Sequence, residues 1–109
     1  MTRITIYKKN QQVIGFSALG HAGYAEAGED IVCSAISVLT INTMNSIETF
    51  TNAKSNLAYD EESGMIDFRI LGNPGKDAKL LLDAMVLGLE TIAEDNNYRN
   101  YMDITYEEV

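Results

Sequence analysis

The only histidine and the only cysteine of the chain, His21 and Cys33, lie twelve positions apart on either side of a glycine-containing segment. A cysteine thiolate is a nucleophile, and a neighbouring imidazole can take its proton and later protonate the leaving amine. Taken alone, a single cysteine is more often a small buried apolar residue than a catalytic one. The two residue types at this spacing nevertheless indicate acyl transfer by a cysteine–histidine pair.

The residues before the cysteine favour the start of a helix. Asp30 is a favourable N-cap residue, so we expect Ile31, Val32 and Cys33 to form the first helical turn. The unpaired backbone N–H groups and the positive dipole end of such a turn stabilise a thiolate, and the N–H of Cys33 and of a neighbour could hold an oxyanion. The carboxylate of Asp30 opposes the stabilisation of a thiolate, and the sequence leaves open which effect is larger.

The segment over residues 20–30 is predicted to be a loop that joins the two reactive residues. Its glycines, Gly20, Gly23 and Gly28, would let it fold back or move over a substrate. Ser37 follows Cys33 by four residues and therefore lies on the same helix face. Its hydroxyl either assists the chemistry or, as is more common in helices, donates to a carbonyl of its own helix.

A metal centre is the main chemical alternative for this segment. Carboxylates of Glu26, Glu29 or Asp30 could join His21 and Cys33 around zinc, but no second histidine or cysteine is present. Thiolate-bound structural zinc normally collects four strong ligands, and the glycines fit neither the dinucleotide-binding nor the P-loop pattern. We therefore expect neither a metal nor a cofactor.

The rest of the chain supplies the elements that must position this segment. Alternation of apolar and polar residues predicts strands over residues 2–7, 13–19, 57–59, 65–71 and 101–106. Helical periodicity predicts helices over residues 31–50 and 78–93. The order ββαββαβ predicts one α+β domain over residues 1–109, with a largely antiparallel sheet packed against two helices.

The same patterns predict which side chains are buried. The expected core residues are Ile14, Phe16 and Ala18 in the second strand, Val32, Ile36 (or Ala35), Leu39, Ile47 and Phe50 in the first helix, and Ile66, Phe68 and Ile70 in the fourth strand. Gly88, inside the second helix, is expected to mark a close contact between helices, because a helical glycine otherwise costs up to about 1 kcal/mol relative to alanine.

Charge and composition restrict the partners. The chain has 109 residues, with 8 basic and 16 acidic side chains and a net charge of −8. Such a surface repels the phosphate backbone of nucleic acids, so we expect no direct nucleic-acid binding, and it attracts a basic protein. A lone cysteine and the lack of a signal peptide favour the reducing cytoplasm, and no apolar run reaches the roughly 20 residues of a membrane span.

A dozen positions of the segment match the motif of a known family. They are Gly20-His21-Ala22-Gly23-Tyr24-Ala25, Gly28, Asp30, Val32-Cys33, Ala35 and Ser37. In this motif, and in length, element order and acidic character, the chain resembles the ribosomal-processing cysteine protease family called Prp.

The resemblance implies a cytosolic, homodimeric endopeptidase in which Cys33 is the nucleophile and His21 the general base and acid. Asp30 and Ser37 match further motif positions and are possible supporting residues. The implied substrate is a basic ribosomal protein precursor, namely large-subunit ribosomal protein number twenty-seven with an N-terminal extension. Cleavage after an aromatic pair implies an apolar pocket near the dyad. The alternative function is a non-catalytic ribosome-associated binding module, in which His21 and Cys33 only shape the loop.

Overall fold

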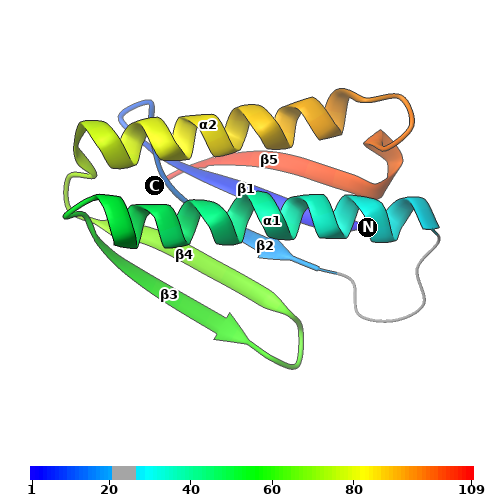
Figure 1. Ribbon diagram of the computed structural model, residues 1–109, viewed down its shortest axis with the longest axis horizontal. Coiled ribbons are helices and arrows are strands. Elements are labelled where there is room, and N and C mark those ends of the chain that lie inside the picture. The colour runs from blue at the N-terminus through cyan, green and yellow to red at the C-terminus, as the bar shows by residue number, and fades with distance from the viewer. Residues whose placement is uncertain (21–26) are drawn as a thin grey trace.

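The computed structural model describes residues 1–20 and 27–109 and contains five strands and two long helices among them (Figure 1). In chain order these are β1 (Thr2–Lys9), β2 (Gln12–Leu19), α1 (Ala27–Phe50), β3 (Lys54–Asp60), β4 (Met65–Leu71), α2 (Gly75–Glu94), the short 3-10 helix η1 (Arg99–Tyr101) and β5 (Met102–Glu108). The predicted order ββαββαβ is therefore confirmed.

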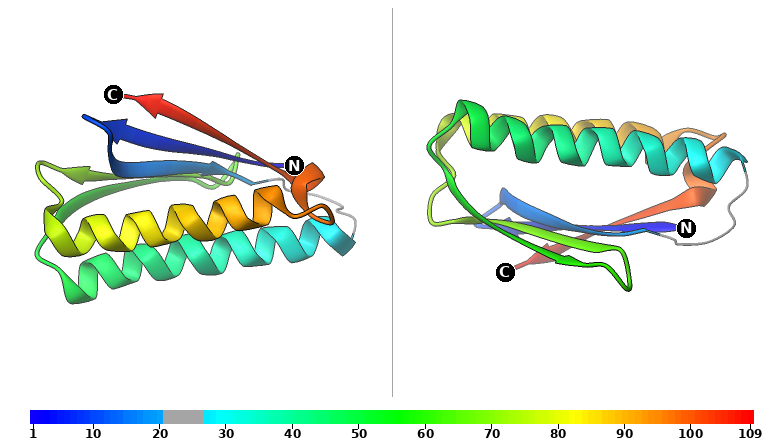
Figure 2. Two further views of the ribbon diagram at one scale, coloured as in Figure 1. Left: turned by 90° about the horizontal axis from the view of Figure 1, so that it is seen from above. Right: turned by 60° about the horizontal axis from the view of Figure 1, so that its bottom comes forward.

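The five strands form one sheet in the order β3-β4-β2-β1-β5. Every pair of neighbouring strands is antiparallel except β1 and β5, which run parallel. Helices α1 and α2 lie side by side on one face of the sheet, as the two views of Figure 2 show. The prediction of a largely antiparallel sheet packed with two helices is confirmed.

The core lies between this face of the sheet and the two helices. Phe16 and Ala18 of β2 are buried there as expected, but Ile14 is only partly buried and Val13 takes its place. The register between β1 and β2 shifts after Tyr7, where a bulge places one extra residue on β2. Because side chains alternate along a strand, one extra residue reverses which side chains face the core, so the prediction for Ile14 was wrong.

Helix α1 packs on the sheet with the apolar stripe that its periodicity predicts, except at its last residue. Val32, Ile36 and Ile47 are buried and Leu39 is partly buried against the core, whereas Phe50 is 75% exposed. The helix ends at Phe50, so no further turn holds that side chain against the core. The buried stripe also contains Thr40 and Thr43, whose hydroxyls donate to the carbonyls of Ile36 and Leu39 on the same helix.

The two helices are in close contact at Gly88 of α2. A Cβ atom at this position would lie 3.1 Å from Cδ2 of Leu39 on α1, which is tighter than an ordinary van der Waals contact. Glycine therefore lets the helices pack at this distance, and the predicted close contact is confirmed.

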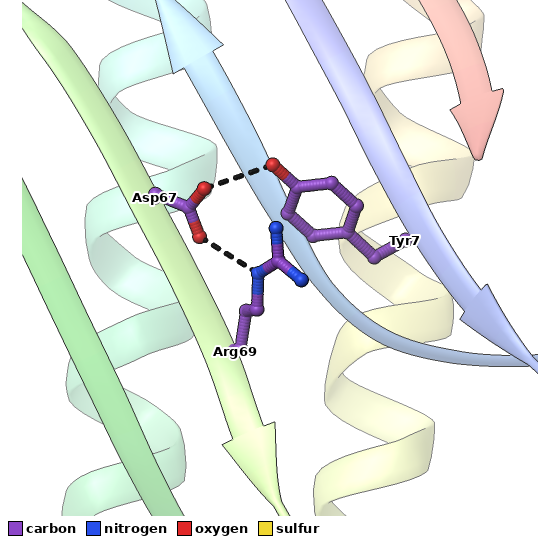
Figure 3. A network of polar contacts seen from close by, with 3 residues as sticks. All are labelled: Tyr7, Asp67 and Arg69. Atoms are coloured by element: carbon purple, nitrogen blue, oxygen red, sulfur yellow. Dashed lines mark hydrogen bonds and ion pairs between the residues drawn. The ribbon is translucent and has the colours of Figure 1, made fainter. Parts of the chain in front are cut away.

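The opposite face of the sheet carries a polar network between β1 and β4 (Figure 3). The hydroxyl of Tyr7 donates to Oδ2 of Asp67 over 2.9 Å, and Nε of Arg69 donates to Oδ1 of the same carboxylate over 3.1 Å. The guanidinium carbon lies 3.9 Å from the centre of the Tyr7 ring. The hydrogen bond to Asp67 raises the pKa of Arg69 above its ordinary value. Both carboxylate oxygens are thus engaged by named donors.

Candidate active site

Helix α1 begins at Ala27, four residues earlier than the sequence predicts. Asp30 consequently lies inside the helix and is exposed, and Gly28 also belongs to the helix rather than to a loop. Acidic side chains are favourable throughout the first helical turn as well as at the N-cap, and alanine and glutamate are strong helix formers. The prediction of Asp30 as the N-cap was therefore wrong.

This earlier start changes what the backbone near Cys33 can do. The cysteine lies in the second turn of α1, where a regular helix pairs each N–H with the carbonyl four residues earlier. The expected oxyanion-binding role of its N–H does not fit this position, because only the first four N–H groups of a helix lack such a partner.

The side chain of Cys33 is free of any disulfide and half-buried between α1 and the sheet. Its Sγ lies 3.3 Å from Oγ1 of Thr2, the first residue of β1, and the two atoms form a hydrogen bond. The start of β1 and the N-terminal part of α1 lie at the same end of the molecule (Figures 1 and 2). The thiol is therefore held between a helix and the central part of the sheet, and it remains partly accessible.

A small cavity of about 90 Å³ opens beside the thiol. Its walls come from the start of β1, the end of β2, one face of α1 and the β3–β4 hairpin. The residues that line it are Thr2, Ala18, Gly20, Cys33, Ile36, Ser37, Thr40, Ile41, Gly64 and Ile66. Alanine, isoleucine and glycine predominate and none of these side chains is charged, so the cavity suits an apolar group next to the sulfur.

The other predicted site residues occupy different positions. Ser37 is exposed and lines the cavity with Cys33, as its spacing on the helix predicts, whereas Asp30 is not among the lining residues. Gly20 also lines the cavity, but a Cβ atom there would meet nothing within 4 Å, so space does not require a glycine. His21 and Gly23 lie outside the described residues.

A metal centre finds no support in the part of the chain that the structure describes. Within it, no three histidine, cysteine, aspartate or glutamate side chains are grouped as metal ligands. The zinc arrangement considered above also needs His21, and one form of it needs Glu26, and both residues lie outside the described ranges.

Sequence reasoning missed Thr2 as a site residue. It precedes Cys33 by 31 positions, and only the pairing of the fold brings them together. The one available signal was the position of the Thr2 hydroxyl. The neighbours of Thr2 on the same face of the strand, Ile4 and Ile6, are core residues. A polar residue at the end of such an apolar row is a candidate for a specific contact.

The sequence model of the family described as cysteine protease Prp matches residues 1–103 of the chain. The chain belongs to the Prp family of cysteine proteases. The ribosomal processing cysteine protease Prp of Staphylococcus aureus strain Mu50 is 33% identical over 78 residues, which are 72% of this chain and 74% of that protein.

Two crystal structures of Prp from S. aureus have the same fold as this chain. One, of an essential ribosomal processing protease in complex with a substrate peptide, has a TM-score of 0.88 and 27% identity, covering 98% of this chain and 100% of the other. The second, with a covalently linked product peptide, has a TM-score of 0.84 and 28% identity at the same coverage. The chain is thus a member of a cysteine protease family, and Cys33 is its only cysteine.

Proposed function

We propose that this protein is an endopeptidase that removes the N-terminal extension of a large-subunit ribosomal protein, number twenty-seven, in the cytoplasm. One observation carries the proposal: the only cysteine of a cysteine protease family member lies half-buried beside a small apolar cavity. The family's related S. aureus structures with a substrate peptide and with a covalently linked product peptide support the same reaction.

In the proposed mechanism, His21 takes the proton of Cys33 and the resulting thiolate attacks the scissile carbonyl carbon. The carbon–nitrogen bond breaks, the amine leaves with the proton from His21, and a thioester joins Cys33 to the N-terminal fragment. A water molecule, deprotonated by His21, then hydrolyses the thioester and restores the thiol. Ser37 and Asp30 are not needed for this proton balance, and we assign them no step.

The charge of the chain supports a basic substrate. With twice as many acidic as basic side chains, its net charge of −8 attracts a basic protein over distances longer than a direct contact. The apolar cavity beside Cys33 would take an apolar side chain next to the scissile bond. We infer that general charge attraction brings the precursor to the enzyme and that the cavity contributes to the choice of bond.

The proposed enzyme acts as a homodimer, and the surface formed by α1 and β3 is our candidate for the interface. The side chains of Leu57 and Tyr59 on β3 are 55% and 61% exposed. The backbone of Tyr59 pairs with Ile66 of β4, but this pairing leaves the tyrosine side chain exposed. Val38 and Ile41 of α1 are also exposed. We name Val38, Ile41, Leu57 and Tyr59 the α1–β3 apolar surface. A second copy would remove it from water, which favours association.

The apolar composition of α1 could also be interpreted as that of a membrane-spanning helix, but the packing of α1 makes this interpretation unnecessary. The expectation that no stretch is apolar and long enough for a membrane span was wrong by length and composition alone, because Asp30–Phe50 meets both criteria. Part of this apolar content is the stripe buried on the sheet, and another part is Val38 and Ile41 of the α1–β3 apolar surface. Core packing and association with a second copy together account for the composition.

The proposed function is tested with the precursor protein itself. Wild-type protein is incubated with the ribosomal protein carrying its extension and, as a control, with the same protein lacking it. We expect mass spectrometry to find a single cut after the aromatic pair of the extension and none in the shorter protein. Binding of the precursor without any cleavage would contradict the proposal and support the non-catalytic binding module.

A further inference from the structure

Thr2 places a buried hydroxyl against the sulfur of Cys33. The side chain of Thr2 is only 3% exposed, and its Oγ1 lies 3.3 Å from Sγ. Its backbone is fixed because β1 lies inside the sheet, with Thr2 paired to Met102 of β5 and the next residue paired to Leu19 of β2. The hydroxyl therefore approaches the sulfur from a rigid strand and not from a loop.

The other buried threonines show that this contact is not a general way to satisfy a hydroxyl. Thr40 and Thr43 donate to carbonyls three or four residues earlier in their own helix. Such a local acceptor is a property of helices, and a strand offers none at this spacing. Packing alone does not require a hydroxyl at Thr2 either, because Ile4 and Ile6 fill the following positions of the same row.

The chemistry of the contact depends on the protonation state of the cysteine. When Cys33 is a thiol, either atom can donate. When it is a thiolate, sulfur can only accept, so the Thr2 hydroxyl must donate, and hydrogen bonds to a charged acceptor are stronger than neutral ones. The contact therefore favours the nucleophilic form and holds Sγ at the edge of the cavity.

We propose that Thr2 is a positioning residue for the nucleophile: its hydroxyl orients Sγ of Cys33 and stabilises the thiolate. This inference rests on the proposed function only in that Cys33 is the attacking group. Thr2 lies on the first strand of the sheet, outside the sequence motif around Cys33, so the motif does not reveal this role.

The test compares Thr2→Val, which keeps the shape and removes the hydroxyl, with Thr2→Ser, which keeps the hydroxyl. Thr43→Val is the matched control, because it removes the hydroxyl of another buried threonine, which lies on α1 and does not line the cavity. We measure kcat and KM for a peptide spanning the cleavage site, the rate of iodoacetamide alkylation of Cys33, and the melting temperature of each variant.

We expect Thr2→Val to lower kcat and the alkylation rate about tenfold with KM within twofold of wild type, as for loss of one hydrogen bond to a charged group. Thr2→Ser should retain at least half of both rates, and Thr43→Val should match wild type. Wild-type rates in Thr2→Val, or equal losses in Thr2→Val and Thr2→Ser, would overturn the proposal.

The alkylation rate keeps the test separate from the proposed function. It needs no peptide, so it reports on the Thr2–Cys33 contact even if the protein does not cleave the precursor. If Thr2→Val fails to fold, Thr2→Ser and Thr2→Ala are compared, and equal alkylation rates in those two folded variants would also overturn the role of the hydroxyl.

Discussion

Strand β1 makes a polar side-chain contact near each of its ends, and the two contacts differ in how fully their atoms are engaged. Tyr7 joins a network on the uncovered face of the sheet, where Asp67 accepts from both Tyr7 and Arg69. Thr2, on the helix-covered face, meets the single sulfur of Cys33. The first contact uses both oxygens of one carboxylate, whereas the second leaves the sulfur bordering a cavity.

This difference separates a structural contact from a chemical one. The network of Tyr7, Asp67 and Arg69 joins β1 to β4 across the strand between them and has its donors and acceptor matched, so we expect its loss to lower stability. The pair of Thr2 and Cys33 holds a nucleophilic atom without enclosing it, so we expect its loss to lower the reaction rate.

Replacing the sulfur should have the largest effect. We expect Cys33→Ala to abolish cleavage of a peptide spanning the extension, because no other cysteine can form the thioester. The melting temperature should change by only a few degrees, since alanine fits a half-buried position in a helix. Peptide-cleavage rates and thermal unfolding of the same preparation check both statements, and cleavage near the wild-type rate would contradict the role of Cys33.

Removing the imidazole should have the next largest effect. His21→Ala should lower kcat/KM by about 10²–10⁴, the usual contribution of general acid–base catalysis. Cleavage kinetics over a range of substrate concentrations measure the change. Full activity in this variant would exclude the dyad while leaving Cys33 as nucleophile, and a loss restored by added zinc in the wild type after chelation would favour the metal alternative.

A charge on the α1–β3 apolar surface should break the dimer. Leu57→Asp should weaken self-association at least tenfold, because an ionised carboxylate would have to leave water at the interface. Light scattering over a dilution series measures the molar mass. Leu80→Asp, at an exposed leucine of α2, is the matched control and should leave the dimer intact. A wild-type protein that stays monomeric at all concentrations would contradict this proposal.

The structural network should respond in stability and not in rate. Asp67→Ala removes the acceptor of both Tyr7 and Arg69, and we expect it to lower the free energy of unfolding by about 1–3 kcal/mol. Urea unfolding measures this change, and kcat on the peptide should stay within twofold of wild type. A large loss of kcat without a loss of stability would contradict the separation of the two contacts.

Salt should have the smallest effect and should act on the encounter with substrate. Between about 0.05 and 0.5 M salt, kcat/KM for the basic precursor should fall severalfold, since exposed charges are screened beyond roughly 10 Å. The value of kcat should change much less. A neutral peptide with the same cleavage site is the control, and equal salt dependence for both substrates would show that charge does not draw in the precursor.

The fold could be predicted largely from local patterns, and the errors of this prediction have physical causes. Alternation located β4 and period-3.6 spacing located α2 because both elements bury one face along their length. Val13 replaced Ile14 in the core because a bulge depends on how two strands pair, which local alternation does not contain. The start of α1 was misplaced because Asp30 is equally favourable at an N-cap and inside the first turn.

The candidate site could be predicted only in part. Cys33 stood out by its uniqueness, and Ser37 by its spacing on the same helix face, so local sequence was enough to place both at the cavity. Thr2 could not be found in this way, because the contact depends on how β1 pairs with β2 and β5 and on how α1 packs across them. Contacts of this kind become visible only in the folded chain.

The most direct test of the central claim is covalent capture with a chloromethyl ketone of the peptide that precedes the scissile bond. Peptide mapping by mass spectrometry locates the label, and residual cleavage activity is measured on the same sample. We predict one label per chain, on Cys33, with activity falling in proportion to the labelled fraction. A label on another residue, or a protein fully labelled at Cys33 that still cleaves the precursor, would contradict the account.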